Sequence, residues 1–302
     1  MPTSSTFPEL PRQPDVHGLQ CMEIIGGNHA VHNHFSSPGM DIWLDSRPCE
    51  GAAGGDIHYF SMCGSGRVTR LAVADVSGHG PVMDDIAQKL RQLMRKYINL
   101  LDQTRFAQAV NQEFILHAGN DYFATIILLT YFAPTDHLII CNGGHPRPIW
   151  YSTRLARWIL LDPATPDVGP SIREAKGTYR LARVSNLPLG IIERTDYHQY
   201  TVRLDKDDFV LVYTDALVEA RNPLGKSLDE DGLMRVLGEL VPSDARQLGQ
   251  QLVERIDGWR GGAPLEDDQT IIVLHHNGTD PAPMTVGTAV RTMLKMLGLR
   301  SV

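Results

Sequence analysis

The stretch from Ala52 to Gly80 constrains the fold of this chain more than any other part of the sequence. It reads as a glycine-rich turn, the run DIHYF, a short turn CGSGR, and a nearly continuous apolar run that ends in ADVSGHG. Two such runs joined by so short a turn predict an antiparallel hairpin. Each predicted strand carries one carboxylate where a buried strand rarely tolerates a charge: Asp56 opens the first, and Asp75 closes the second.

The predicted hairpin brings these two carboxylates together. Residues directly opposite each other on paired strands lie only about 5 Å apart. Two unpaired carboxylates at that separation repel each other unless a cation lies between them. The stretch therefore predicts a site for a hard divalent cation.

Two further places repeat the pattern of an acid beside an apolar strand. Asp215 follows the apolar run at 209–213, and the pair Asp267-Asp268 precedes the run QTIIVL. A single aspartate at a strand end is usually a turn former or a helix cap. Four such places in one chain favour one shared, oxygen-rich site instead. No histidine-rich or cysteine-rich ligand set accompanies the acids, which favours magnesium or manganese over zinc.

The order of the predicted elements indicates an antiparallel α+β fold. Helices are expected at about 81–97, 105–117, 229–240 and 243–259, the last with Ser243 as its N-cap. Strands are expected at 40–48, in the central hairpin, at 122–134 and 137–144 around a turn, within 147–161, at 209–213 and after Asp268. Because strands and helices come in separate groups, alternating βαβ units are disfavoured.

Both ends of the chain and one internal segment lack a sustained pattern. Residues 1–39 are expected to form an N-terminal arm, in which the histidines of GGNHAVHNHF lie on a solvated loop and hold no metal. Residues 40–276 are expected to form the folded domain. Residues 277–302 are expected to form a tail whose short amphipathic helix packs on the body or on a second chain, which would give a homodimer. The proline-rich stretch 162–186 is expected to be a mobile flap.

Charge and composition disfavour several classes of partner. The net charge of −7 gives no basic surface for nucleic acid or an anionic membrane. No segment approaches the roughly 20 apolar residues that a membrane span needs, and the first residues lack the apolar core of a signal peptide. The four cysteines show no CxxC pairing, so structural thiols in a reduced compartment are expected. We therefore expect a cytoplasmic protein that binds neither nucleic acid nor membranes.

Six motifs occur in a fixed order along the chain: GGDIHYF, VADVSGHG, NGGHPRP, LPLGI, VLVYTDALVEA and DDQTIIVL. In these motifs, over about residues 40–276, the chain resembles the bacterial PPM/PP2C-type serine/threonine phosphatases of the SpoIIE/RsbU class. The resemblance implies an α-β-β-α sandwich of two antiparallel sheets flanked by helices. It also implies two manganese or magnesium ions, held by Asp56, Asp75, the backbone carbonyl of Val76, Asp215 and Asp267. Asp268 is a further candidate ligand beside Asp267.

The resemblance also implies a reaction. It is hydrolysis of phosphoserine or phosphothreonine by a water that two metal ions activate, with Asp56 and Asp75 as catalytic residues. The implied substrate is a STAS-type anti-sigma-factor antagonist in partner-switching signalling. His79 and His145 are candidates for protonating the leaving serine oxygen, and the alternative for each is that it shapes a glycine-bounded turn.

The chain departs from the family pattern at one position and leaves one role unassigned. Ala216 stands where the family usually has glycine, which could supply a positive φ or a close backbone approach. No arginine is assignable as a phosphate clamp, since the spacing does not identify Arg47. Ala216 supports an alternative function, a pseudophosphatase or phosphoprotein-binding regulatory module. The retained acids oppose that alternative, because buried carboxylates without a cation are costly.

Overall fold

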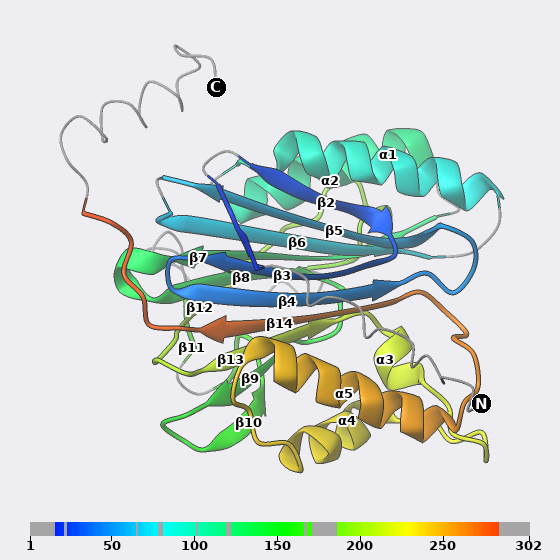
Figure 1. Cartoon of the computed structure of the whole chain (residues 1–302). Helices are drawn as coiled ribbons and strands as arrows, with labels where there is room; N and C mark the ends of the chain where they lie inside the picture. Colours follow the sequence, from blue (N-terminus) through cyan, green and yellow to red (C-terminus); the bar gives the residue numbers. More distant parts are fainter. Residues whose placement is uncertain are drawn as a thin grey trace, which may run out of the picture.

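Two sheets lie face to face between two layers of helices (Figure 1). The computed structural model describes residues 16–20, 23–64, 66–77, 81–100, 102–118, 122–165, 168–170 and 186–283. Within these residues each sheet has seven strands, and every pairing is antiparallel except that of the two-residue strand β1 with β3. This is the α-β-β-α sandwich that the family resemblance implies.

The first sheet, which we call the β4 sheet, contains in spatial order β1 (His17–Gly18), β3 (Val31–Ser37), β4 (Met40–Arg47), β14 (Gln269–His276), β13 (Phe209–Tyr213), β9 (Ile149–Ser152) and β10 (Arg157–Leu160). The second, the β6 sheet, contains β11 (Val168–Pro170), β12 (Gln199–Arg203), β8 (His137–Gly143), β7 (Ala124–Phe132), β6 (Val68–Val76), β5 (Ala53–Cys63) and β2 (Ile24–His29).

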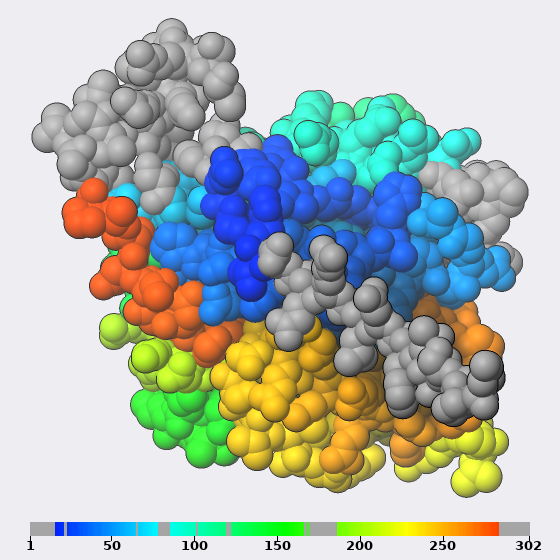
Figure 2. Space-filling model, viewed as in Figure 1, coloured from blue at the N-terminus to red at the C-terminus, as the bar shows by residue number. Residues whose placement is uncertain are grey.

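The helices divide between the two outer faces. Helices α1 (Pro81–Tyr97) and α2 (Gln103–Ala118) pack on the β6 sheet, whereas α3 (Ala216–Glu219), α4 (Asp229–Gly238) and α5 (Ala245–Arg260) pack on the β4 sheet. A short 3₁₀ turn, Ala133–Thr135, joins β7 to β8. Figure 2 shows the cyan α1–α2 pair and the yellow to orange α4–α5 pair at opposite sides of the molecule, with strands between them.

The apolar run in β6 is continuous because both of its faces are buried. Leu71 and Val73 point into the core between the sheets, and Ala72 and Ala74 point toward the helices. This follows from the two-residue period of a strand in the middle of a sandwich. Small alanines on the outer face let α1 approach the sheet.

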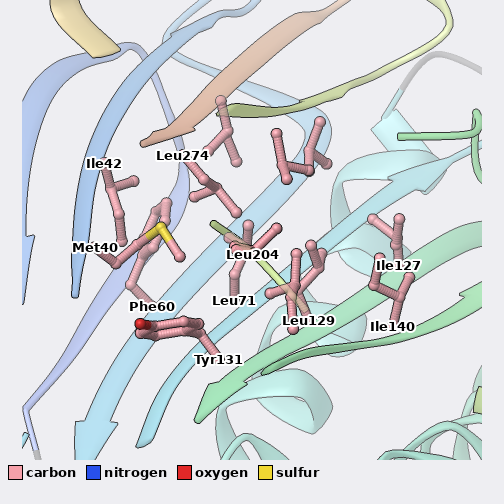
Figure 3. Packing of buried hydrophobic residues seen from close by; sticks show 14 of the residues in the cluster. Met40, Ile42, Phe60, Leu71, Ile127, Leu129, Tyr131, Ile140, Leu204 and Leu274 are labelled. Carbon is pink, nitrogen blue, oxygen red and sulfur yellow. The ribbon is translucent and has the colours of Figure 1, made fainter. Parts of the chain in front are cut away.

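The inter-sheet core consists of large apolar side chains from both sheets. Met40, Ile42 and Leu274 of the β4 sheet face residues of the β6 sheet such as Phe60 and Leu129 (Figure 3). All of them are almost fully buried. This core fixes the distance between the sheets, and with it the distance between polar residues at the ends of strands from different sheets.

Most of the predicted elements are confirmed within a few residues. They are the central hairpin, the four long helices, the β7–β8 hairpin, and the strands β9, β10, β13 and β14. Most of the predicted flap and the predicted tail helix lie outside the described residues. Residues 168–170, which we expected in the flap, pair with β12 instead.

The sequence interpretation was wrong about residues 24–37. We expected a solvated loop in an N-terminal arm, but Ile24–His29 and Val31–Ser37 are strands that pair with β5 and β4. The polar and glycine-rich composition hid them, because β2 is at a sheet edge and β3 is only partly buried. The N-cap of α5 also differs, since Asp244 rather than Ser243 accepts the Gln247 N–H.

Candidate metal centre

The acids meet at one end of the sandwich, the right-hand end in Figure 1, where β4 stops and β14 begins. We call it the metal end. The hairpin register places Asp56 on β5 directly opposite Asp75 on β6. Asp75 is in turn opposite Thr125 on β7. Two aspartates from adjacent strands therefore lie side by side near the strand ends of the β6 sheet.

A hydroxyl from the other sheet binds one of these carboxylates. Thr214, which follows β13, donates its hydroxyl to Asp56 Oδ2 at 2.8 Å. The same Thr214 oxygen accepts the backbone N–H of Thr270 at 2.9 Å. The Thr270 hydroxyl lies 3.0 Å from the Ser46 hydroxyl on β4. The Thr214–Asp56 bond joins the two sheets and holds Asp56 in place, and the Thr270 N–H fixes the Thr214 hydroxyl.

The other oxygen of Asp56 is not satisfied. Asp56 is 3% exposed, and its Oδ1 has no hydrogen-bond partner among the described residues. Burial, and then the charge of Asp75, raise the pKa of Asp56 well above its usual range. An unpaired buried carboxylate oxygen is costly without a cation, so this atom fits a metal ligand.

The charges of the remaining acids at the metal end raise one another's pKa values. Burial raises the pKa of Asp75, and the charges of Asp215 and Asp267 raise it further. Burial also raises the pKa of Asp215, followed by the charges of Glu219 and Asp267. Carboxylates from β5, β6, the end of β13 and the start of β14 therefore form one electrostatic cluster. An all-oxygen cluster of this kind suits magnesium or manganese.

The paired acids before β14 have different surroundings. Asp268 is buried, and its Oδ1 accepts the Cys49 N–H at 2.8 Å while its Oδ2 accepts the Gly55 N–H. A Cβ at Gly54 would lie 2.3 Å from Asp268 Oδ2, which explains why a glycine precedes Gly55. Asp268 thus holds the turn that presents Asp56. Asp267 is exposed, and its charge raises the pKa values of Asp75 and Asp215.

Ala216 fits its position without strain. It is the first residue of α3, in helical backbone conformation, and is buried. Asp215 just before it also has helical φ and ψ angles of −62° and −26°. A glycine's access to positive φ is therefore not needed in this chain.

The histidine candidates have different outcomes. His79 lies outside the described residues. His145 is buried with Nδ1 2.8 Å from the Thr125 hydroxyl, and its backbone N–H donates to Asn142 Oδ1. Burial lowers the pKa of His145 to about 3, which favours the neutral form of the ring. These contacts support the turn-shaping alternative for His145, and its role as an acid stays a prediction.

No phosphate-binding arginine stands free at the cluster among the described residues. Arg47 pairs with Asp45 at 2.6 Å and with Asp257 at 3.2 Å. A cleft of about 200 Å³ adjoins Asp267 and is lined in part by Arg221, whose partner Glu266 is 3.7 Å away. Both partners are more than half exposed, so this pair is weak. Arg221, which also donates to the Gly225 carbonyl oxygen at 3.2 Å, is thus a weakly ion-paired arginine beside the cluster.

Sequence reasoning missed three residues of this end. Thr214 and Thr270 each neighbour a predicted acid, and their position beside the strand ends was an available signal. Cys49 carried none. Its Sγ and oxygens of Asp267 and Asp268 all lie within 4.8 Å of one another. Burial and the nearby acids raise the pKa of the Cys49 thiol to about 11.

Comparison with known proteins matches the fold and the motifs. The family described as Stage II sporulation protein E (SpoIIE) matches residues 65–171 and 168–277. The phosphoserine phosphatase RsbU of Bacillus subtilis (strain 168) is 25% identical over 241 residues, which are 78% of this chain and 63% of RsbU. The chain therefore spans less than two thirds of that relative.

Two solved structures show the same fold. The phosphatase domain of SpoIIE from Bacillus subtilis, with a fragment of its regulatory domain, has a TM-score of 0.63 at 17% identity over 87% of this chain and 71% of that one. RsbX in complex with magnesium has a TM-score of 0.56 at 15% identity over 81% of this chain and 99% of that one. Within the described residues, no helix is long and apolar enough to cross a membrane.

Proposed function

The chain belongs to the SpoIIE family, and on that premise we propose that it is a metal-dependent protein serine/threonine phosphatase. The observation that carries the proposal is the buried pair Asp56 and Asp75, with one carboxylate oxygen unsatisfied, at a strand end of a PP2C-like sandwich. The RsbU relative is named a phosphoserine phosphatase, which supports the same reaction.

The proposed ligands of two manganese or magnesium ions are Asp56, Asp75, the backbone carbonyl of Val76, Asp215 and Asp267. Ions bound there would supply Lewis acidity and lower the pKa of a water molecule. Magnesium in the related RsbX structure supports a divalent ion.

The chain's own residues hold this ligand set in place before any ion binds. Thr214 orients Asp56 from the opposite sheet, and Asp268 holds the turn before it. Neutral His145 bonds Thr125, the residue that is opposite Asp75 in the sheet. Such supporting contacts reduce the reorganisation that ion binding would otherwise require.

The proposed substrate is a phosphorylated serine or threonine on a folded protein, of the STAS type in partner switching, in the cytoplasm. The net charge of −7 argues against polyanionic substrates such as nucleic acid. The cleft beside Asp267, with the loosely paired Arg221, offers a surface for residues near the phosphate. A homodimer remains a proposal that involves the tail outside the described residues.

The test measures hydrolysis of p-nitrophenyl phosphate and of a phosphorylated STAS protein from the same cell, with manganese and with a chelator. We expect turnover of both with manganese and none with the chelator. We also expect kcat/KM to be higher on the phosphoprotein than on its isolated phosphopeptide. Absence of manganese-dependent turnover on either substrate would refute the phosphatase assignment, whereas equal rates on peptide and protein would refute only the substrate class.

The alternative of a pseudophosphatase or phosphoprotein-binding regulatory module rested on Ala216. The helical backbone at Ala216 removes that argument, because no positive φ is required there. No observation on the described residues favours this alternative, and the retained carboxylates count against it.

A further inference from the structure

Three large apolar side chains are exposed together beside the metal end. Phe123 is 41% exposed, Ile191 49% and Ile192 44%. The two isoleucines are consecutive, and a Cβ at Gly190 would lie 3.2 Å from the Phe123 Cα, so the three residues form one surface. We call this surface the apolar rim. Single exposed apolar side chains are ordinary, but a contiguous group of them is typical of an interaction surface.

The apolar rim adjoins the proposed metal ligands. Asp75 is opposite Thr125 in the β6 sheet. Phe123 precedes Thr125 by two residues, which span at most ~7 Å of chain. Because residues opposite each other lie about 5 Å apart, the Phe123 Cα is within roughly 12 Å of the Asp75 Cα. The Ser77 hydroxyl donates to the Phe123 carbonyl oxygen at 2.8 Å and fixes this arrangement.

A buried asparagine holds the two isoleucines in their exposed position. Asn111 of α2 is 1% exposed, and its side chain spans the turn. Its Oδ1 accepts the Gly190 N–H at 2.9 Å, and its Nδ2 donates to the Ile192 carbonyl oxygen at 2.9 Å. The Thr195 hydroxyl donates to the same carbonyl oxygen at 3.2 Å. Turning the isoleucines inward would break the bonds of a buried amide, which is costly. A surface held in this way loses little conformational freedom on binding.

We propose that the apolar rim recognises the protein part of the substrate, and that it selects a folded phosphoprotein with an apolar surface beside its phosphoserine. An interface of standard size covers about 800 Å² on each partner, a disc roughly 16 Å in radius. A protein that presents a phosphorylated side chain to the proposed ligands therefore also covers Phe123. The exposed charged residues Glu193 and Arg194 follow the isoleucines and supply the polar border that such interfaces have. This inference rests on the proposed function and specifies its substrate.

A small substrate does not use this surface. p-Nitrophenyl phosphate brings only a phosphate and one ring to the ions, whereas a folded protein also buries the isoleucines. Burial of apolar surface then adds to the binding energy of the protein substrate alone. The rim therefore contributes to the ratio of kcat/KM on the phosphoprotein to kcat/KM on p-nitrophenyl phosphate.

The experiment compares the full wild-type chain with the double variant Ile191→Gln/Ile192→Gln and with the control Val241→Gln. Val241 is 82% exposed and lies between α4 and α5, in the helix layer on the opposite outer face. Each protein is assayed with manganese on the phosphorylated STAS protein and on p-nitrophenyl phosphate. Binding of the unphosphorylated STAS protein, which needs no turnover, is measured by calorimetry, and melting temperatures confirm that the variants fold.

We expect the ratio of the two kcat/KM values to fall at least about tenfold in the double variant, or ~1.4 kcal/mol in barrier, because the rim then buries less apolar surface. The affinity for the unphosphorylated protein should fall by a similar factor. Val241→Gln should keep both quantities within about twofold of wild type, as a surface change elsewhere does.

An unchanged ratio in the double variant, or an equal loss in Val241→Gln, would overturn the proposal, and so would a failure of the unphosphorylated protein to bind the wild type. Absence of manganese-dependent turnover of p-nitrophenyl phosphate would instead refute the phosphatase assignment. In that case the binding measurement still decides whether the apolar rim contacts the protein.

Discussion

The two ends of the sandwich differ in how many hydrogen-bond partners their carboxylates have. At each end a polar cluster joins the β4 sheet to the β6 sheet. Away from the metal end, His276 of β14 has Nε2 2.9 Å from the Tyr131 hydroxyl and 3.1 Å from Asp136 Oδ1, and Tyr131 donates to the same Asp136 oxygen. We call this the closed end. Its one carboxylate has two side-chain partners.

The metal end has several carboxylates and too few donors. One threonine hydroxyl serves Asp56, and two backbone N–H groups serve Asp268. Asp56 Oδ1 is left without a partner among the described residues. A satisfied carboxylate adds stability, whereas an unsatisfied buried one is a cost that a cation can relieve. Among the described residues of the closed end, the buried atom without a partner is a ring nitrogen, His276 Nδ1. The number of hydrogen-bond partners of the carboxylates therefore distinguishes a structural cluster from a functional one. Experiments can contradict this distinction.

The largest expected effect is a loss of phosphatase activity when a carboxylate at the metal end is removed. Asp56→Asn should lower manganese-dependent phosphatase activity at least about 100-fold, or ~2.7 kcal/mol in barrier, because it removes a proposed ligand. The metal-free variant should melt at the same or a higher temperature, since the repulsion with Asp75 is gone. Activity is measured on p-nitrophenyl phosphate, and melting by calorimetry.

The matched control for this variant is Asp136→Asn at the closed end. Asp136 has φ of 55°, a conformation that asparagine also adopts readily, so the change adds no backbone strain. Activity should be kept and the melting temperature should fall. The comparison fails if Asp56→Asn retains full activity, or if both variants respond alike.

The second effect concerns the ion itself. Manganese at 100 times its dissociation constant should stabilise the wild-type fold by about 2.7 kcal/mol, which corresponds to roughly 5–10 °C in melting temperature. Asp75→Asn should remove most of this shift, and Asp136→Asn should keep it. A chelator should return the wild type to its metal-free melting temperature. An equal shift in all three proteins would mean that manganese binds elsewhere.

The third effect tests whether the hydrogen bonds of the closed end stabilise the fold. Tyr131→Phe removes the hydroxyl that Asp136 and His276 share, and it should reduce the free energy of unfolding by about 1–3 kcal/mol. The phenyl ring preserves the inter-sheet packing, so the loss reports on the hydroxyl. Urea unfolding measures it. Unchanged stability would show that the closed end is not the stabilising cluster that its hydrogen bonds indicate.

The smallest effect concerns Ala216. Ala216→Gly should change turnover less than about tenfold, or ~1.4 kcal/mol in barrier, because alanine already has the helical backbone that the site uses. Stability should fall by roughly 0.5–1 kcal/mol, as glycine does in a helix. A wild type that is inert with manganese and gains activity on this change would instead support the pseudophosphatase alternative.

Particular residues show how far sequence reasoning reached. The opposition of Asp56 and Asp75 was predictable, because a short turn and a two-residue period set a hairpin register locally. Strands β2 and β3 were missed because β2, at a sheet edge, and β3, only partly buried, are polar and lack an apolar pattern. The burial of His145 could not be predicted, because it depends on β13 and β7 packing around it. The N-cap of α5 was displaced by one residue, within the usual uncertainty of helix ends.

The sequence by itself determined the fold class, the order of the long helices and most strands, and the identity of the acids. These follow from local periodicity, turns and apolar runs, which neighbouring residues carry. Only the tertiary structure decided what surrounds each acid. Thr214 and Asp56 are 158 residues apart in the chain, and Cys49 and Asp268 are 219 apart. Contacts across such separations depend on how two sheets pack, and no local pattern encodes that distance.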